Sequence, residues 1–228
     1  ATVVADGSDI PGWIVAVPRG PRPVVVSLWY VVHEFTEGKV VRSVAFFRKL
    51  HDTLPDAEVI LLGEEPGLAE TANKLGVKHL SNVDRNASGT PLISSMFQLA
   101  RENSASDLLC IINADMILMP DFVKPAMESR SLLLEHRRLD AGLHNFVLLS
   151  QRWDLDVTQT LEFTAGWQNR LSSMVHDQGF LHRPAGSDFF LFPRFCYTDV
   201  PSFTIGRAGW DNWMIYKARR EKWPVIDC

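Results

Sequence analysis

Residues 107–122, DLLCIINADMILMPDF, constrain the fold of this chain more than any other stretch. The apolar run from Leu108 to Ile112 is typical of a strand buried on both faces, as in a parallel sheet between helices. Because side chains alternate along a strand, Asn113 and Asp115 would point to the same side. A buried carboxylate is costly without a partner, so we expect Asp115 to meet a hydrogen-bond network, a cation or solvent. The carboxyl end of an open α/β sheet, where ligands bind, would provide such a place.

Predicted strands and helices alternate along the rest of the chain. The strands are expected at residues 24–32, 57–63, 77–80, 108–112, 145–153, 186–194 and 225–228. The helices are expected at residues 42–50, 67–76, 92–102, 120–139, within 155–184 and within 206–224. Strands alternating with helices through short polar loops predict an α/β fold, with a parallel sheet covered by helices on both faces.

Composition excludes several classes of partner. The net charge of -4 and the pI of about 6.0 give no electrostatic footprint for nucleic acid or an anionic membrane. No apolar stretch approaches the roughly 20 residues that span a bilayer, so no transmembrane segment is expected. We expect residues 1–228 to form a single domain, with an irregular arm over residues 1–20. A soluble cytoplasmic protein is expected, with a Golgi-lumenal fragment as the alternative.

The order of these elements resembles the GT-A fold of nucleotide-sugar glycosyltransferases, especially the family-2-like inverting enzymes. In that fold the fourth strand ends in an Asp-x-Asp motif that binds a divalent metal and the donor diphosphate, and here Asn113-Ala114-Asp115 stands in its place. The resemblance implies a GT-A-like (Rossmann-like), mostly parallel central sheet. It also implies that Asp115, helped by Asn113, holds Mn²⁺ or Mg²⁺. Asn113 departs from the family's acidic residue at the first position.

A second segment, GRAGWDNWMIYKARR at residues 206–220, resembles the Gly-Glu-Asp segment in which an acidic residue opens a helix and acts as catalytic base. By position this residue would be Asp211. A carboxylate there could take the proton of an acceptor hydroxyl as that oxygen attacks the donor sugar. A plainer reading is that Asp211 only caps its helix and complements the helix dipole, and both roles can coexist.

The resemblance places the donor nucleotide, of UDP, GDP or dTDP type, at the ends of the first two strands and in the loop before the third helix. The candidate nucleotide-binding residues are Ser27, Leu28, Trp29, Tyr30, Glu64, Arg85, Asn86, Gly89, Thr90, Asn113 and Ala114. Gly89 would permit close approach of the backbone. The alternatives are a solvated turn at Glu64 and a simple helix entry at Thr90.

Candidates for the donor-sugar or acceptor side are Asp188, Trp210 and Trp213, since aromatic faces suit sugar rings. Asp188 could equally form a turn with Gly186 and Ser187. The seven histidines form no recognisable zinc spacing and are interpreted as surface or ordinary hydrogen-bonded residues. The family often supplies a further histidine ligand after the catalytic helix, near where Cys228 stands here, so either that ligand lies beyond Cys228 or the metal is held loosely.

The sequence therefore predicts a hexosyl- or deoxyhexosyltransferase of carbohydrate biosynthesis, moving a sugar from a nucleotide-diphosphate donor to an acceptor hydroxyl, with inversion and a divalent metal. One alternative is a non-catalytic module that binds sugar nucleotides or glycans. A sugar nucleotidyltransferase ranks lower, because such enzymes resemble one another in a Gly-rich basic loop after the first strand, where this chain reads WYVVHEF.

Overall fold

The structure is a computed structural model that describes residues 24–28, 57–113, 116–119, 122–139, 145–157, 162, 164–183, 186–207 and 209–227. Several predictions fall outside these residues: the irregular arm over residues 1–20, the helix over 42–50, and the site candidates Trp29, Tyr30, Ala114 and Asp115. None of the helices in the described part of the chain has the length and apolarity needed to cross a bilayer.

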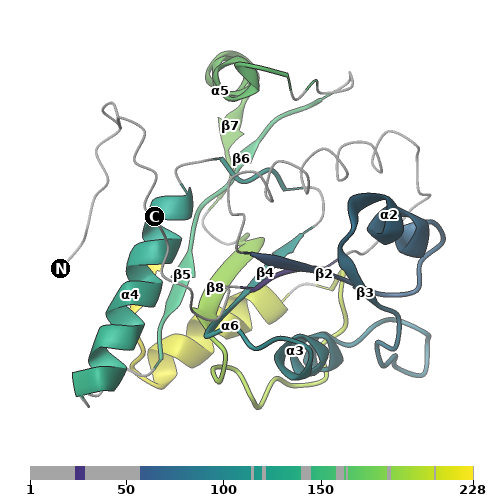
Figure 1. The fold of residues 1–228 in the computed structure, drawn as a ribbon, viewed down its shortest axis with the longest axis vertical. Coiled ribbons are helices and arrows are strands. Elements are labelled where there is room, and N and C mark those ends of the chain that lie inside the picture. Colours follow the sequence, from purple (N-terminus) through teal and green to yellow (C-terminus); the bar gives the residue numbers. More distant parts are fainter. Residues whose placement is uncertain are drawn as a thin grey trace.

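Seven strands form the central sheet, in the order β3-β2-β1-β4-β8-β5-β9 (Figure 1). They are β1 (Val24–Leu28), β2 (Glu58–Leu62), β3 (Lys78–Leu80), β4 (Leu108–Asn113), β5 (Val147–Leu149), β8 (Phe189–Pro193) and β9 (Val225–Asp227). Each lies within or beside a stretch predicted to be a strand. At the centre, Leu108, Ile112 and the residues between them are at most 2% exposed, as expected of a strand covered on both faces.

The sheet is mixed, which corrects the expectation of a mostly parallel sheet in one respect. Strands β3, β2, β1 and β4 pair in parallel, as do β5 and β9, whereas β8 runs antiparallel to both β4 and β5. All five residues of β8, FFLFP, are buried. An apolar run indicates a buried strand but says nothing about the direction in which it pairs. The sequence therefore predicts β8 but not its antiparallel orientation.

Helices cover both faces of the sheet, as predicted. One face packs against α3 (Ile93–Glu102) and α6 (Trp210–Arg220), and the other against α2 (Leu68–Leu75) and α4 (Val123–Leu139). Alternate residues of β4 divide between the two faces: Leu109 and Ile111 face α3 and α6, and Cys110 faces α2 and α4. Burial raises the pKa of the Cys110 thiol well above its ordinary value, which fits a core residue.

The region between β5 and β8 differs from the prediction. The strand expected over residues 145–153 is interrupted, and its end forms β6 (Trp153–Asp154), which pairs antiparallel with β7 (Phe180–Leu181). The mostly helical region contains α5 (Trp167–Gln178), in which Trp167 and Leu171 are buried. Figure 1 shows α5 and this two-stranded sheet standing apart from the central sheet, beyond the end of β5. Strands of two residues are too short to leave a periodic pattern in a sequence.

Helix α6 is held against the segment that follows β8 by a buried tyrosine and a buried lysine. The Tyr197 hydroxyl donates to the Met214 carbonyl at 3.0 Å, and Tyr197 packs edge-on against Phe192 of β8. Lys217 Nζ lies 2.6 Å from Asp199 Oδ2 and 3.1 Å from Glu221 Oε1. The hydrogen bond from Lys217 lowers the pKa of the Asp199 carboxyl, and the same bond raises the pKa of the Lys217 ammonium.

Asp199→Asn should lower the free energy of unfolding at pH 7 by about 1 kcal/mol or less, because Asp199 is largely exposed. A carboxyl group whose pKa is lowered by folding stabilises the fold at pH values above its unfolded-state pKa. This stabilisation is lost as the pH falls through the folded-state pKa. The difference between wild type and variant should therefore shrink below pH 3.8, the ordinary value for this group. Urea denaturation between pH 7 and pH 3 measures it, with Asp156→Asn as an exposed control. A difference that stays constant over this range would rule out the ion pair as its source.

Candidate active site

One edge of the sheet gathers the ends of its central strands. Leu28, the last residue of β1, is in register with Leu62 of β2 and with Asn113 of β4. Ile112 is paired with Phe189, the first residue of β8, so Asp188 enters the sheet beside the end of β4. The predicted sites at the ends of β1, β2 and β4 thus meet at the carboxyl edge, and Asp188 joins them there.

Helix α6 begins next to this edge. Its N-cap, Gly209, has a φ of 114°, a conformation that glycine adopts without strain. The first helical residue, Trp210, packs against Phe190 of β8 with ring centroids 5.7 Å apart. The Asp211 carboxylate accepts a hydrogen bond from the Asn212 backbone N–H at 2.8 Å. Among the described residues, no Lys, Arg or His lies within ion-pair distance of Asp211, so its side chain is not committed to a cation there.

The loop before α3 is closed by its own side chains. Asn86 Oδ1 accepts hydrogen bonds from the backbone N–H groups of Ser88 and Thr90, at 3.0 and 2.9 Å. Arg85 Nη1 donates to the Gly89 carbonyl at 2.8 Å, which fixes the guanidinium over the loop. Arg85, Asn86, Gly89 and Thr90 therefore form one turn, as the sequence placed them.

Arg85 also links this loop to the end of β2. Its guanidinium lies 2.9 Å from Glu64 Oε1 and 3.1 Å from Glu65 Oε1. The Glu64 side chain is 60% exposed and the Glu65 side chain only 14%. Glu65 Oε2 is buried and has no hydrogen-bond partner among the described residues. The resemblance places Glu64 beside the nucleotide, whereas in the structure the Glu65 side chain is the more buried of the two carboxylates.

Asp188 does more than form a turn. Its carboxylate is paired with Arg152, which also holds Asp154 at 2.7 Å, and His182 Nδ1 lies 2.6 Å from Asp154 Oδ2. Arg152, Asp154 and His182 were not among the site candidates. Arg152 and Asp188 are 36 residues apart in the chain, and no local pattern links them. The sequence hints at it only in that Arg152 and Asp154, two residues apart at the end of a predicted strand, carry opposite charges.

The two tryptophans proposed for the acceptor side are packed into the protein. Trp210 is 8% exposed and belongs to the core on the α3 and α6 side of the sheet. Trp213 is partly buried and packs against Tyr197 and Phe203, with ring centroids 6.1 and 5.7 Å apart. These contacts give Trp210 a core role, whereas Trp213 is only partly buried and keeps part of its surface exposed.

The predicted metal ligands are Asn113 and Asp115. Asn113 ends β4 in the predicted place, and Asp115 follows outside the described residues. Within the described ranges no group of three or more His, Cys, Asp or Glu side chains could hold a metal. A carboxylate and an amide oxygen are hard oxygen donors, and the chemistry of this pair fits Mg²⁺ or Mn²⁺.

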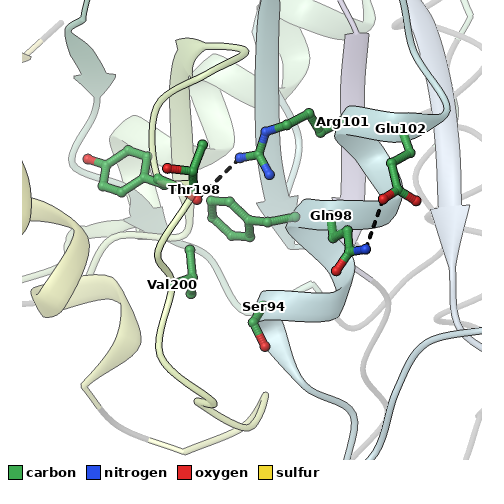
Figure 2. A pocket seen from close by; sticks show the side chains of 8 residues that line it. Ser94, Gln98, Arg101, Glu102, Thr198 and Val200 are labelled. Carbon is green, nitrogen blue, oxygen red and sulfur yellow. Dashed lines mark hydrogen bonds between the residues drawn. The ribbon is translucent and has the colours of Figure 1, made fainter.

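A pocket of about 310 Å³ lies away from this edge, between α3 and residues 197–200 (Figure 2). Arg101 at its wall donates to the carbonyls of Arg194, Cys196 and Tyr197, at 2.9, 2.9 and 3.2 Å. These residues follow β8, at the edge where β4 begins. Burial and the nearby Arg194 lower the pKa of Arg101. The guanidinium thus secures the chain after β8, and the pocket is remote from the carboxyl-edge residues.

No protein-family model matches the chain, and no curated protein matches it. Solved structures do match. One is described as a nucleotide-diphospho-sugar transferase from Desulfovibrio desulfuricans, at 12% identity and a TM-score of 0.48 over 90% of this chain and 79% of that one. Another is glucosyl-3-phosphoglycerate synthase from Mycobacterium tuberculosis with Mn²⁺, uridine-diphosphate and phosphoglyceric acid, at 18% identity and 0.48 over 90% and 68%.

A third match is CMP:2-keto-3-deoxy-manno-octonic acid synthetase complexed with CTP, at 11% identity and a TM-score of 0.48 over 92% of this chain and 89% of that one. Nucleotide-sugar transferases of low sequence identity are thus among the proteins to which this chain is similar.

Proposed function

We propose that this protein is a glycosyltransferase of the GT-A type, moving a sugar from a nucleotide-diphosphate donor to an acceptor hydroxyl with inversion. The observation that carries the proposal is a set of three features near one sheet edge: the end of β4 at Asn113, the entry of Asp188 beside it, and the start of α6, where Trp210, next to Asp211, packs against Phe190 of β8. The sequence resemblance assigns distinct roles to the first and the last of these features.

Asp211 is proposed as the catalytic base. One of its carboxylate oxygens accepts the Asn212 N–H, which holds the side chain at the first turn of α6. An acceptor hydroxyl is a poor nucleophile, and a carboxylate within hydrogen-bond reach can remove its proton as the oxygen attacks the sugar carbon. The uncommitted charge of Asp211 supports this role.

Asp115 and Asn113 are proposed to hold Mn²⁺ or Mg²⁺ at the end of β4. A divalent cation bound there would neutralise charge on the leaving nucleoside diphosphate. The nucleotide is proposed to lie along the ends of β1 and β2, against the Arg85 loop. Glu64, whose side chain is 60% exposed and lies 2.9 Å from Arg85 Nε, is proposed to accept a hydrogen bond from base or ribose.

Donor turnover tests this proposal. The protein is incubated with UDP-, GDP- and dTDP-sugars in Mn²⁺ and again in EDTA, and release of the nucleoside diphosphate is measured. We expect metal-dependent release from donors of one nucleotide, and inversion at the anomeric carbon when the transferred product is followed by NMR. Release of pyrophosphate from a nucleoside triphosphate and a sugar phosphate would instead indicate a nucleotidyltransferase. Binding without turnover of any donor would indicate a non-catalytic module.

A further inference from the structure

The two-stranded β6–β7 sheet has two chemically different faces. Trp153 is paired with Leu181, and Asp154 with Phe180. The backbone N–H of His182 donates to the Arg152 carbonyl at 2.9 Å, which continues the pairing by one residue. Because residues paired across antiparallel strands share a face and neighbours alternate, Arg152, Asp154, Phe180 and His182 lie on one face. Trp153 and Leu181 lie on the other.

The first face carries a connected polar network. Arg152 joins the carboxylates of Asp154 and Asp188, and His182 Nδ1 lies 2.6 Å from Asp154 Oδ2. Burial opposes the charge on Asp154, but the hydrogen bonds from His182 and Arg152 outweigh it and lower the pKa of that carboxyl. Through Asp188, the network reaches the sheet edge beside the end of β4.

The loop that leads into β8 lies against the same network. A Cβ placed on Gly186 would come within 2.6 Å of His182 Nε2, so this position accommodates no larger residue unless the imidazole moves. Glycine here allows the backbone to approach the ring closely. The polar face of the β6–β7 sheet and the entry to β8 are thus connected through His182, Arg152 and Asp188.

Phe180 is the unexplained member of this face. Its side chain is 63% exposed, although it is paired with Asp154 across the β6–β7 sheet. An exposed aromatic ring next to fixed hydrogen-bonding groups is the composition that recognises an amphipathic ligand, with one apolar surface and several hydroxyls. A sugar ring has this character: its C–H groups can pack on the negative face of an aromatic ring, and its hydroxyls can both donate and accept.

The charge of the network restricts the ligand further. Two carboxylates face one guanidinium in this network, so the Arg152 guanidinium is already paired and the carboxylates outnumber it. A phosphorylated or carboxylated ligand would be repelled there. The surface therefore favours an uncharged carbohydrate over an acidic one.

We propose that the face formed by Arg152, Asp154, Phe180 and His182 is the acceptor subsite of this enzyme and binds a neutral sugar residue stacked on Phe180. Asp154 and His182 bind its hydroxyls, and Asp188 lies between this sugar and the end of β4. The inference rests on the proposed function. It places the acceptor on the β6–β7 sheet rather than at Trp210 and Trp213, whose rings are packed in or against the core.

The test measures glycan binding by the full chain on a printed array of neutral and acidic oligosaccharides, followed by titration of the best neutral glycan. Phe180→Ala should weaken that binding by about tenfold or more, the loss expected of an aromatic anchor. Phe195→Ala is the matched control, because Phe195 is also 63% exposed and follows β8 at the opposite edge. The control should bind within about twofold of wild type, and Phe180→Trp should restore binding.

Three outcomes overturn the subsite: equal binding by Phe180→Ala and wild type, preference for acidic glycans, or no glycan retained from the array. Hydrolysis of the sugar nucleotide with water as acceptor is measured in parallel, and the control Phe195→Ala should leave it unchanged. Donor hydrolysis without Phe180-dependent glycan binding refutes the subsite alone. Phe180-dependent glycan binding without any donor turnover refutes the proposed function and leaves a glycan-binding surface.

Discussion

Asp211→Asn is expected to lower the rate of glycosyl transfer by about 10²–10⁴-fold, the contribution typical of a positioned general base. Asparagine keeps the shape of aspartate and an oxygen that can accept the Asn212 N–H, so the first turn of α6 should persist. The amide cannot take a proton from the acceptor hydroxyl. We expect the loss in kcat, with little change in donor affinity, measured as nucleoside diphosphate release at saturating donor.

Glu70→Gln is a suitable control for this variant. Glu70 is an exposed acid in the first turn of α2, so the change removes the same charge from the start of another helix. Each variant should lose up to about 1 kcal/mol of stability through the helix dipole. Only the Asp211 variant should lose transfer. A folded Asp211→Asn protein with full activity would reduce Asp211 to a helix-capping residue and remove the base assignment.

The prediction from sequence was most successful where a segment carried its own signal. The run from Leu108 to Ile112 lies within β4, and α2 lies within the helix predicted over residues 67–76, ending at Gly76 in a left-handed conformation. The residues of the Arg85 loop are brought together because Asn86 and Arg85 bond to backbone groups only a few residues away. Burial, helix ends and tight turns are local properties, and the sequence expresses them directly.

The features that were missed depend on contacts between distant residues. The pairing of Arg152 with Asp188 brings together two segments that the sequence gives no reason to join. The burial of Trp210 depends on Phe190, 20 residues earlier in a strand whose direction was unknown. An aromatic residue at the start of a helix looks the same in sequence whether it faces a sugar or a core. Its packing partner decides the role, and tertiary structure supplies that partner.

Asp115→Ala is expected to abolish the metal-dependent stabilisation of this protein by its nucleotide. A ligand at a hundred times its dissociation constant stabilises a fold by about 2.7 kcal/mol, which for a chain of this size raises Tm by about 5–10 °C. If Asp115 holds the cation that bridges to the diphosphate, removing the carboxylate should have the same effect as EDTA. Asp177→Ala, which removes an exposed carboxylate from α5, should keep the full shift.

A thermal-shift titration tests whether the end of β4 forms the site for a metal and a nucleoside diphosphate. Wild type, Asp115→Ala and Asp177→Ala are each titrated with UDP, GDP and dTDP in Mn²⁺ and in EDTA. The predicted result is stabilisation by one nucleotide in Mn²⁺, absent in EDTA and absent in Asp115→Ala. Equal stabilisation of wild type and Asp115→Ala, or stabilisation unaffected by EDTA, would contradict the claim.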